Sequence, residues 1–266
     1  MLELNKVHQM DCLKGLKLIE DNSIDLIITS PPYNKAGLHK IKKQIHYGKS
    51  RKWNETIDYG GFLDVDNMDE EDYEKWQIDV LNECYRVLKP NGSVFYNHKN
   101  RIYKGSIISP YKWLFQSKFI IRQEIIWDRG STHNVNRSRY LPTTEQIFWL
   151  TKTNKPTFDR LLTTKFKNEV WNMPFERNNN HPAPFPIDIP NNIISCVKCN
   201  RSDIIVLDPF MGSGTTALSA KINDCKWIGF ELFEEYIDMT NKRLQHAKTY
   251  NTYNYTTNTV KHPQNA

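Results

Sequence analysis

The sequence predicts a doubly wound α/β fold built on a mostly parallel central sheet. Strand-like and helix-like segments alternate along most of the 266 residues, which is typical of this fold class. Two strand-like segments, residues 24–29 and 204–207, are almost continuously apolar, as expected of strands buried on both faces. A loop rich in proline or glycine follows each of them, and ligands of open α/β sheets bind at such carboxyl ends.

The first part of the chain contains the longest expected helix. Residues 71–88 are assigned to it because Tyr73, Trp76 and Val80 recur at helical spacing. The elements expected here, in order, are a strand at 7–10, a helix at 13–19, a strand at 24–29, the helix at 71–88, a turn at 90–92 and a strand at 93–96.

The second part continues the alternation, and its last unit is the clearest. A strand at 204–207 leads through a glycine loop into a helix that begins near Thr215. The other elements expected here are strands at 123–127, 146–150 and 227–230, and a helix at 234–246.

Three segments lie outside this alternation. Residues 35–52 are basic, residues 154–190 are irregular and rich in Asn and Pro, and the residues after Thr249 are almost entirely polar. We therefore expect one domain over residues 1–248, with a basic loop insertion at 35–60 and a disordered tail at 249–266.

Composition limits the classes of function. The formal net charge of +6 suits a polyanionic partner such as nucleic acid, although an ordinary soluble protein can carry the same excess. Five scattered cysteines do not form a disulfide framework. The opening residues lack the apolar core of a signal peptide, and no long uncharged stretch is present, so we expect a cytoplasmic protein that does not enter a membrane.

The first chemical motif is Thr-Ser-Pro-Pro-Tyr-Asn at residues 29–34, directly after a buried strand. Consecutive prolines stiffen the backbone, so the Pro31 carbonyl can act as a rigid acceptor. Ser30 adds a second acceptor and Tyr33 an aromatic face. This set fits a planar base that carries an NH2 group, although a proline turn that merely ends a strand would look the same.

The second motif is Asp-Pro-Phe-Met-Gly-Ser-Gly-Thr-Thr at residues 208–216, between a strand and a helix. Gly212 and Gly214 allow a tight turn and a close approach of the backbone to a ligand. Glu231 ends the next strand, where an acidic residue commonly accepts hydrogen bonds from ribose hydroxyls. The lysine of a phosphate-binding loop and the third glycine of a dinucleotide fingerprint are absent, which favours a nucleoside cofactor without a phosphate.

Cys196 and Cys199 have the spacing of half a zinc site. No second Cys or His pair lies at suitable spacing, so we expect no metal and interpret the pair as the end of a helix.

Together the two motifs resemble those of bacterial amino-methyltransferases from restriction–modification systems. In that family a Ser/Asp/Asn-Pro-Pro-aromatic motif is catalytic and a Phe-x-Gly-x-Gly motif binds the cofactor. The catalytic motif comes first here, which resembles the permuted order of the β class. The resemblance covers residues 7–244 and implies a Rossmann-like fold that uses S-adenosylmethionine. It also matches His-Pro-Ala-Pro-Phe-Pro at 181–186, a segment that closes over the methionine part of the cofactor, and Asp11, near the cofactor adenine.

The resemblance implies a role for each matching residue. Ser30, Pro31, Pro32 and Tyr33 would be catalytic: Ser30 and the Pro31 carbonyl hold the amine, and Tyr33 stacks on a base flipped out of the duplex. The methyl group would pass directly and in line to the nitrogen. The cofactor would contact Asp11, Pro184, Phe185, Asp208, Pro209, Phe210, Met211, Gly212, Ser213, Gly214, Thr215, Thr216 and Glu231.

The sequence gives weaker signals for the identity of the target base and for the residues that contact DNA. Ser at position 30 favours cytosine-N4 over adenine-N6, by association with relatives and not by the physics of the site. Base readout would involve residues 152–180, a short target-recognition region. Arg129, His133, Arg137 and Arg139 form a polar cluster that could reach DNA. Phosphate contacts are assigned to Lys40, Lys42, Lys43, Lys49, Arg51, Lys52, Arg137 and Arg139.

The resemblance also suggests partners and leaves alternatives open. Besides double-stranded DNA, a second copy of the chain and a cognate restriction endonuclease are the suggested partners. The first alternative is an adenine-N6 DNA methyltransferase. An RNA or protein amide methyltransferase shares the amine-holding geometry but ranks lower, because Asn or Asp more often opens the catalytic motif in those relatives. A DNA-binding protein that has lost activity is disfavoured because every residue of both motifs is present.

Overall fold

The computed structural model describes residues 2–34, 68–132, 137–174 and 185–247. These residues form one eight-stranded sheet, in the order β1-β10-β9-β2-β3-β7-β6-β8, and a separate two-stranded hairpin, β4-β5. The strands are β1 (Lys6–Gln9), β2 (Ile24–Thr29), β3 (Leu88–His98), β4 (Arg101–Tyr103), β5 (Ser106–Ile108), β6 (Ile120–Asp128), β7 (Thr144–Thr151), β8 (Val170–Asn172), β9 (Ile205–Asp208) and β10 (Lys226–Glu231).

Parallel pairing dominates the large sheet. Strands β1, β10, β9, β2 and β3 pair in parallel, and β6 pairs in parallel with β8. Within the described part of this sheet, β7 alone runs against its neighbours β3 and β6. The predicted mostly parallel, doubly wound α/β fold is confirmed. Because β7 is reversed, it begins at the edge where the parallel strands end.

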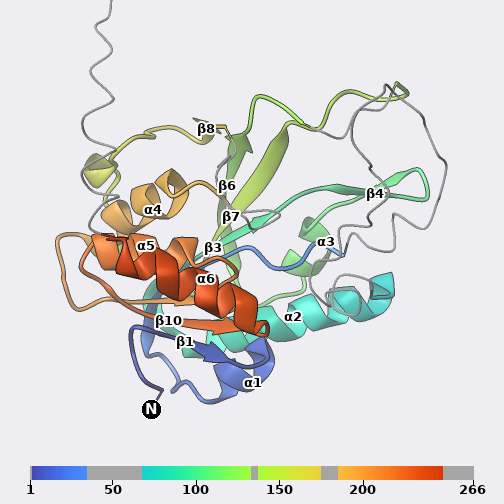
Figure 1. Cartoon of the computed structure of the whole chain (residues 1–266). Helices are drawn as coiled ribbons and strands as arrows, with labels where there is room; N and C mark the ends of the chain where they lie inside the picture. The colour runs from blue at the N-terminus through green and yellow to red at the C-terminus, as the bar shows by residue number, and fades with distance from the viewer. Residues whose placement is uncertain (1, 35–67, 133–136, 175–184, 248–266) are drawn as a thin grey trace, which may run out of the picture.

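Helices cover both faces of the sheet (Figure 1). They are α1 (Cys12–Lys17), α2 (Glu70–Val87), α3 (Tyr111–Leu114), α4 (Asp188–Lys198), α5 (Thr215–Ile222) and α6 (Glu234–Gln245), with a 3-10 turn at Arg160–Leu162. Buried residues of α1, α2 and α3 share one hydrophobic core, and those of α4, α5 and α6 share the other. The three C-terminal helices lie together on one face in Figure 1, in orange and red.

Strand β2 shows why the two faces need two cores. All six of its residues are buried. Leu26 and Ile28 point into the core under α4–α6, whereas Ile27 points into the core under α1–α3; Ile24, which lies before the register shift with β3, also packs in the core under α1–α3. Alternation along a strand sends successive side chains to opposite faces, so a strand covered on both sides is apolar at most of its positions. This is the pattern that identified the strand in the sequence.

Most expected elements lie within a few residues of the observed ones, with three differences. The expected turn at 90–92 lies inside β3, where the pairing register with β2 shifts between Ile24 and Leu26. The hairpin β4-β5 and the short helix α3 were not expected. Strand β8 lies in the stretch 154–190 that was expected to be irregular. Short elements lack the length over which periodicity becomes visible.

Candidate active site

The two sequence motifs meet through one buried carboxylate. Asp208, at the end of β9, accepts hydrogen bonds from Thr29 Oγ1 (2.8 Å) and Thr216 Oγ1 (2.7 Å), and from the backbone N–H of Phe210 (3.0 Å). Burial raises the pKa of this carboxyl to about 6, and the three donors oppose that rise. Only 2% of Asp208 is exposed, so its side chain holds the two loops together and does not face an open site.

The glycine loop is shaped by helix α6. Gly214 has φ +77°, and a Cβ at this position would lie 2.4 Å from Thr240 Cγ2. Thr240 Oγ1 also donates to the Gly212 carbonyl (3.0 Å), and Arg243 donates to the Ser213 carbonyl (2.7 Å). The close approach that requires glycine at 214 is therefore an approach to α6, and it fixes the loop that leads into α5.

Glu231 closes the other side of the glycine loop. Its Oε2 accepts the N–H of Gly212 (2.8 Å), and its Oε1 accepts the N–H groups of Leu232 (2.8 Å) and Phe233 (3.1 Å). Burial raises the pKa of Glu231, while these three donors oppose the rise. Each carboxylate oxygen has two acceptor positions, so Oε2 keeps one for a ligand hydroxyl.

Ser30 and Tyr33 face each other within the proline loop. Their hydroxyl oxygens lie 2.9 Å apart, and the Tyr33 ring packs against His98 with centroids 4.5 Å apart. The sequence suggested an open aromatic face at Tyr33, but the residue is only 7% exposed. Burial, with the nearby charge of Glu145, raises the pKa of Tyr33 well above its ordinary value. The phenol therefore stays protonated and can donate.

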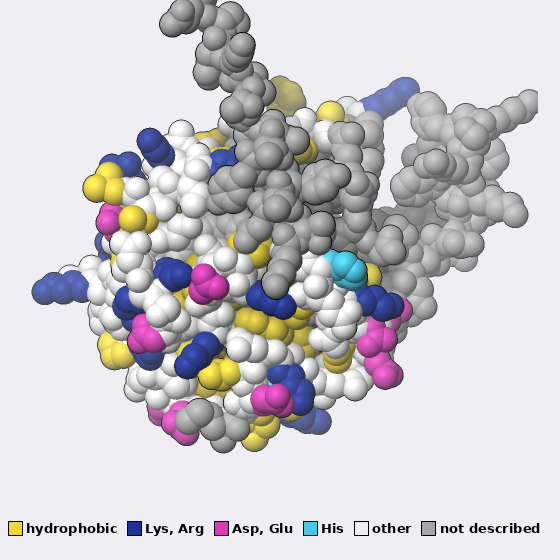
Figure 2. Space-filling model, turned by 60° about the vertical axis from the view of Figure 1, so that its left-hand side comes forward, with side chains coloured by type: hydrophobic (Ala, Val, Ile, Leu, Met, Phe, Trp, Pro, Cys, Tyr) yellow, Lys and Arg dark blue, Asp and Glu magenta, His cyan; other side chains and the backbone are white. Residues whose placement is uncertain are grey.

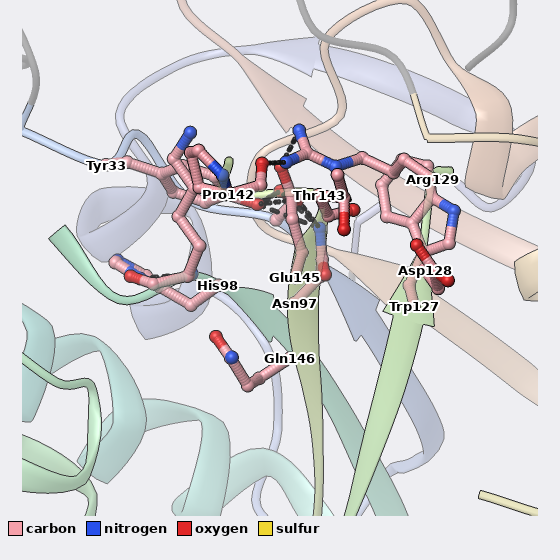
Figure 3. A network of polar contacts seen from close by, with 12 residues as sticks. Tyr33, Asn97, His98, Trp127, Asp128, Arg129, Pro142, Thr143, Glu145 and Gln146 are labelled. Carbon is pink, nitrogen blue, oxygen red and sulfur yellow. Dashed lines mark hydrogen bonds and ion pairs between the residues drawn. The ribbon is translucent and has the colours of Figure 1, made fainter. Parts of the chain in front are cut away.

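A buried polar network surrounds these hydroxyls (Figure 3). Glu145 Oε2 accepts from Tyr33 OH (3.0 Å) and from Asn97 Nδ2 (3.1 Å), and Glu145 Oε1 accepts from Arg129 Nη1 (3.2 Å). Asn97 Nδ2 also reaches Tyr33 OH (2.8 Å) and Ser30 Oγ (3.3 Å). The Oδ1 atom of Asn97 is buried and has no partner among the described residues, which leaves an acceptor for a bound molecule.

Arg129 was assigned in the sequence to a cluster that could reach DNA, and this is wrong for its side chain. The residue is buried, and besides Glu145 its guanidinium donates to the carbonyls of Pro142 (2.7 Å) and Thr143 (3.1 Å). A buried cation beside a buried carboxylate balances its charge. Arg129 therefore belongs to the network around Tyr33.

A second chain of hydrogen bonds ends on the proline loop. Tyr73 OH donates to the Pro32 carbonyl (2.6 Å), and Gln77 Nε2 donates to Tyr73 OH (2.9 Å). Gln77 Oε1 accepts from Tyr96 OH (2.8 Å), which accepts from Trp113 Nε1 (3.0 Å). Each donor in this series points toward the loop. The neighbouring Pro31 carbonyl accepts no hydrogen bond among the described residues, so it is the one left for a ligand.

His98 joins this second chain, and its tautomer follows from its neighbours. Tyr73 OH gives its single proton to the Pro32 carbonyl, so His98 Nε2, 2.8 Å away, donates to Tyr73 OH; Nδ1 lies 2.8 Å from the N–H and 2.9 Å from the carbonyl of Lys99. The loop then ends at Asn34, whose side chain bonds to Met68 and to Glu70. Both ends of the proline loop are thus tied to the protein interior.

The remaining predicted residues are less central to this site or lie outside the described part. Asp11 caps α1 by accepting from Lys14 N (3.0 Å), next to the edge where β1 pairs with β10. Phe185 packs into the core under α4, and its assignment to the cofactor stays a prediction. Cys199 ends α4 in a left-handed conformation, so the interpretation of the Cys pair as a helix end is confirmed. Pro184, His133, and the basic residues Lys40, Lys42, Lys43, Lys49, Arg51 and Lys52 lie outside the described residues, as does the tail 249–266.

Two of the arginines assigned to DNA, Arg137 and Arg139, lie in the described part of the chain. Arg137 is exposed and Arg139 half-buried in the segment between β6 and β7. On the face shown in Figure 2, basic and acidic side chains are interspersed, so neither sign of charge dominates its described part. Among the described helices, none combines the length and the hydropathy that crossing a membrane requires.

Sequence reasoning missed the residues that come from outside the two motifs. Asn97, Glu145 and Tyr73 were not selected, because each is a single polar residue in an otherwise apolar strand or an amphipathic helix. The only local signal was a polar side chain at the end of a buried strand, as in Asn97 after residues 93–96. Glu145 gave no such signal, since it is the second residue of its strand, between Thr144 and Gln146, and reaches the site only because β7 is reversed.

The sequence of this chain is similar to those of known DNA methyltransferases. A family model described as DNA methylase matches residues 24–242. The DNA adenine methyltransferase YhdJ of Escherichia coli (strain K12) is 31% identical over 272 residues, which cover 90% of this chain and 82% of YhdJ.

Solved structures show the same fold at lower sequence identity. The PvuII DNA methyltransferase (cytosine-N4-specific) has a TM-score of 0.68 at 22% identity, covering 90% of this chain and 87% of its own. The M1.HpyAVI–SAM complex has a TM-score of 0.59 at 21% identity, covering 90% and 98%.

Proposed function

The chain belongs to the DNA methylase family, and on that premise we propose that it methylates the N4 amine of cytosine in double-stranded DNA. The observation that carries the proposal is the junction at Asp208. Its carboxylate binds Thr29, directly before Ser30, and Thr216, in the glycine loop. A target amine held at the first loop and a methyl donor held at the second would therefore lie side by side.

Ser30 and Pro31 would hold the amine. The nitrogen of an aminopyrimidine is a poor nucleophile, because its lone pair is delocalised into the ring. Acceptors at Ser30 Oγ and the Pro31 carbonyl would draw both amine hydrogens out of the ring plane and free that lone pair. Most of the catalysis is then positioning together with local dipoles. Pro32 contributes by anchoring the loop through Tyr73.

The residues of the glycine loop fit S-adenosylmethionine as the cofactor, which when bound supplies the methyl group and accepts the electron pair of the broken S–C bond. Glu231 Oε2 keeps an acceptor position for a ribose hydroxyl. Helix α5 begins at Thr215, and its N-cap Gly214 offers no side-chain cap, so its first N–H groups and its dipole favour the carboxylate of the methionine part. Asp11 lies close in sequence to Gln9, which pairs with Glu231, and is assigned to the adenine side.

DNA recognition is proposed from the sequence and from Arg137 and Arg139, of which the first is exposed and the second half-buried. The target base must leave the duplex to reach the buried acceptors. Arg137, Arg139 and the basic residues of 35–60 would bind phosphates, and residues 152–180 would read bases. We also propose that the enzyme serves a restriction–modification system in the cytoplasm. A homodimer and a cognate endonuclease belong to the same proposal.

Adenine-N6 is the second candidate for the methylated atom. It is favoured by the 31% identity to a relative named as an adenine methyltransferase. Cytosine-N4 is favoured by Ser at position 30, because serine at this position is associated with relatives that methylate cytosine-N4. Both bases present an exocyclic amine, so the mechanism is common to the two candidates.

One experiment separates the candidates. The purified protein is incubated with S-adenosylmethionine carrying a labelled methyl group and with unmethylated bacterial DNA, which is then digested to nucleosides for mass spectrometry. We expect the label on N4-methylcytosine. A label on N6-methyladenine would replace cytosine by adenine and keep the mechanism. Cofactor binding without label in DNA would redirect the search to RNA and protein substrates.

A further inference from the structure

The carboxylate of Glu145 lies one hydrogen bond away from the pair of hydroxyls that would hold the amine. It is 7% exposed and comes from β7, outside both motifs. Arg129 Nη1 at 3.2 Å balances its charge, and Tyr33 OH and Asn97 Nδ2 donate to its other oxygen. With donors directed at both of its oxygens, this carboxylate acts as an acceptor toward Tyr33.

This acceptor determines the direction of the hydrogen bond between Tyr33 and Ser30. Tyr33 OH has a single proton, and it goes to Glu145 Oε2 (3.0 Å). The Tyr33 oxygen must then accept from Ser30 Oγ, 2.9 Å away, as it accepts from Asn97 Nδ2 at 2.8 Å. The proton of Ser30 is thereby committed to Tyr33. Only lone pairs of Ser30 Oγ remain for a substrate.

We propose that Glu145, supported by Arg129, is a specificity-determining positioning residue that makes Ser30 a pure acceptor. The inference rests on the proposed function, since it assumes that Ser30 meets the exocyclic group of the flipped base. A pure acceptor binds an NH2 group and repels a carbonyl oxygen. The site therefore selects cytosine over uracil or, if adenine is the target, adenine over hypoxanthine.

The physical basis of this selection is the cost of an unpaired acceptor. A carbonyl oxygen placed against Ser30 Oγ and the Pro31 carbonyl would be left without a donor in a buried place, as would the Pro31 oxygen, and Ser30 Oγ would keep only the 3.3 Å contact from Asn97 Nδ2. Sites built on hydrogen bonds to a substrate group reject analogues that lack it far more strongly than apolar pockets do. If the Ser30 proton were free to turn outward, the carbonyl would gain a donor and the selection would weaken.

The substitution Glu145→Gln tests the direction of the hydrogen bonds that run from Ser30 through Tyr33 to Glu145. The glutamine can donate to the Tyr33 oxygen, which frees the tyrosine proton for Ser30 and the serine proton for the substrate. The tightness of binding is measured for two duplexes that differ only in cytosine or uracil at the target position, once the recognition site is mapped. We expect the preference for cytosine to fall at least about tenfold, with a lower kcat and an unchanged KM for the cofactor. Glu145→Asp, which keeps the carboxylate, should restore part of the preference.

Asp25→Asn is the matched control. Asp25 is also a buried carboxylate, 3% exposed, with Lys89 at 2.7 Å and Arg201 at 3.3 Å, but it lies at the opposite end of β2 from Ser30. It should lower the melting temperature and leave the base preference unchanged. Tyr33→Phe interrupts the chain at its centre and should reproduce the loss of preference seen in Glu145→Gln.

The outcomes distinguish this inference from the proposed function. If wild type methylates DNA and Glu145→Gln keeps the full preference, losing activity only in step with stability as Asp25→Asn does, the inference is overturned alone. If wild type methylates no DNA and shows no preference between the duplexes, the proposed function fails and the inference fails with it. If Glu145→Gln and Tyr33→Phe lose the preference for cytosine over uracil and Asp25→Asn keeps it, the hydrogen bonds run from Ser30 through Tyr33 to Glu145, as proposed.

Discussion

Thr29 Oγ1 donates a 2.8 Å hydrogen bond to Asp208 Oδ1, joining residues that are 179 positions apart in the chain. The bond connects the ends of β2 and β9, which are neighbours in the sheet. Because Asp208 also holds Thr216, a displacement of either motif is transmitted to the other. The geometry of the amine-binding loop and that of the glycine loop are thus coupled through one carboxylate.

This carboxylate should make stability depend on pH. Burial raises the pKa of Asp208 from 3.8 to about 6, so between these values the folded protein binds more protons here than the unfolded chain. The contribution of Asp208 to the free energy of unfolding is therefore fully present below pH 3.8 and is lost as the pH rises through about 6. As the pH rises through this range, we expect the free energy of unfolding of wild type to fall by roughly 2–4 kcal/mol relative to that of Asp208→Asn. Chemical denaturation at several pH values measures the difference, and a constant difference would contradict the assignment.

Tyr73→Phe should damage the proline loop without touching the glycine loop. The substitution removes the donor to the Pro32 carbonyl and leaves buried groups of Gln77 and His98 without their partner. We expect the free energy of unfolding to fall by about 1–3 kcal/mol, and turnover to fall while the Kd for the cofactor stays near that of wild type.

The control for this substitution is Tyr85→Phe, on the same helix. The Tyr85 ring packs against Phe119, and its hydroxyl makes no hydrogen bond to any described residue. It should change neither stability nor turnover. Equal effects of the two substitutions would show that the hydroxyl of Tyr73 has no special role.

Gly214→Ala should destabilise the protein more than another glycine with positive φ. Gly214 and Gly105 have φ +77° and +82°, but a Cβ at 105 meets nothing within 4 Å, whereas one at 214 meets Thr240. Both substitutions incur the left-handed backbone penalty of about 1–2 kcal/mol, and Gly214→Ala adds overpacking of about 1–3 kcal/mol. Thermal unfolding of the two variants isolates the second contribution; similar melting temperatures would refute the contact with α6.

Glu231→Gln should weaken cofactor binding first. Glutamine has one acceptor oxygen where glutamate has two. The variant therefore loses part of the hydrogen bonding from the backbone N–H groups of Gly212, Leu232 and Phe233. It also loses the acceptor position offered to a ribose hydroxyl. Hydrogen bonds to charged groups contribute about 1.5–3 kcal/mol, so we expect roughly 10- to 100-fold weaker binding by calorimetry, with kcat at saturation mostly retained. The exposed Glu234, in the first turn of α6, is the control as Glu234→Gln. An unchanged Kd for Glu231→Gln would remove Glu231 from the cofactor site.

Ser30→Ala should have the opposite profile. It removes one of the two proposed amine acceptors, so we expect kcat to fall roughly 100-fold, comparable to the loss of one transition-state hydrogen bond, with cofactor binding near normal. Ser23→Ala, whose hydroxyl bonds to Glu20 at the other end of β2, is the control. Normal turnover in Ser30→Ala would exclude Ser30 from amine binding.

The sequence by itself determined the fold class and the two loops. Continuous apolar runs such as residues 24–29 identify strands buried on both faces, because both cores of this fold demand it. Helical spacing identified α2, and the order of the two motifs supported the family. These are local signals, since periodicity and turn chemistry depend on residues close together in the chain.

Only the tertiary structure decided what surrounds the two loops. Asp208 turned out to hold Thr29 and Thr216 inside the protein, and Tyr33 turned out to be covered by His98. Glu145 reached the site because β7 runs against its neighbours, which places its first residues beside the last residues of β3 and β6. Strand direction and neighbour order are set by the packing of the whole chain, so a single polar residue at the start of an apolar strand gives no sign of them in the sequence.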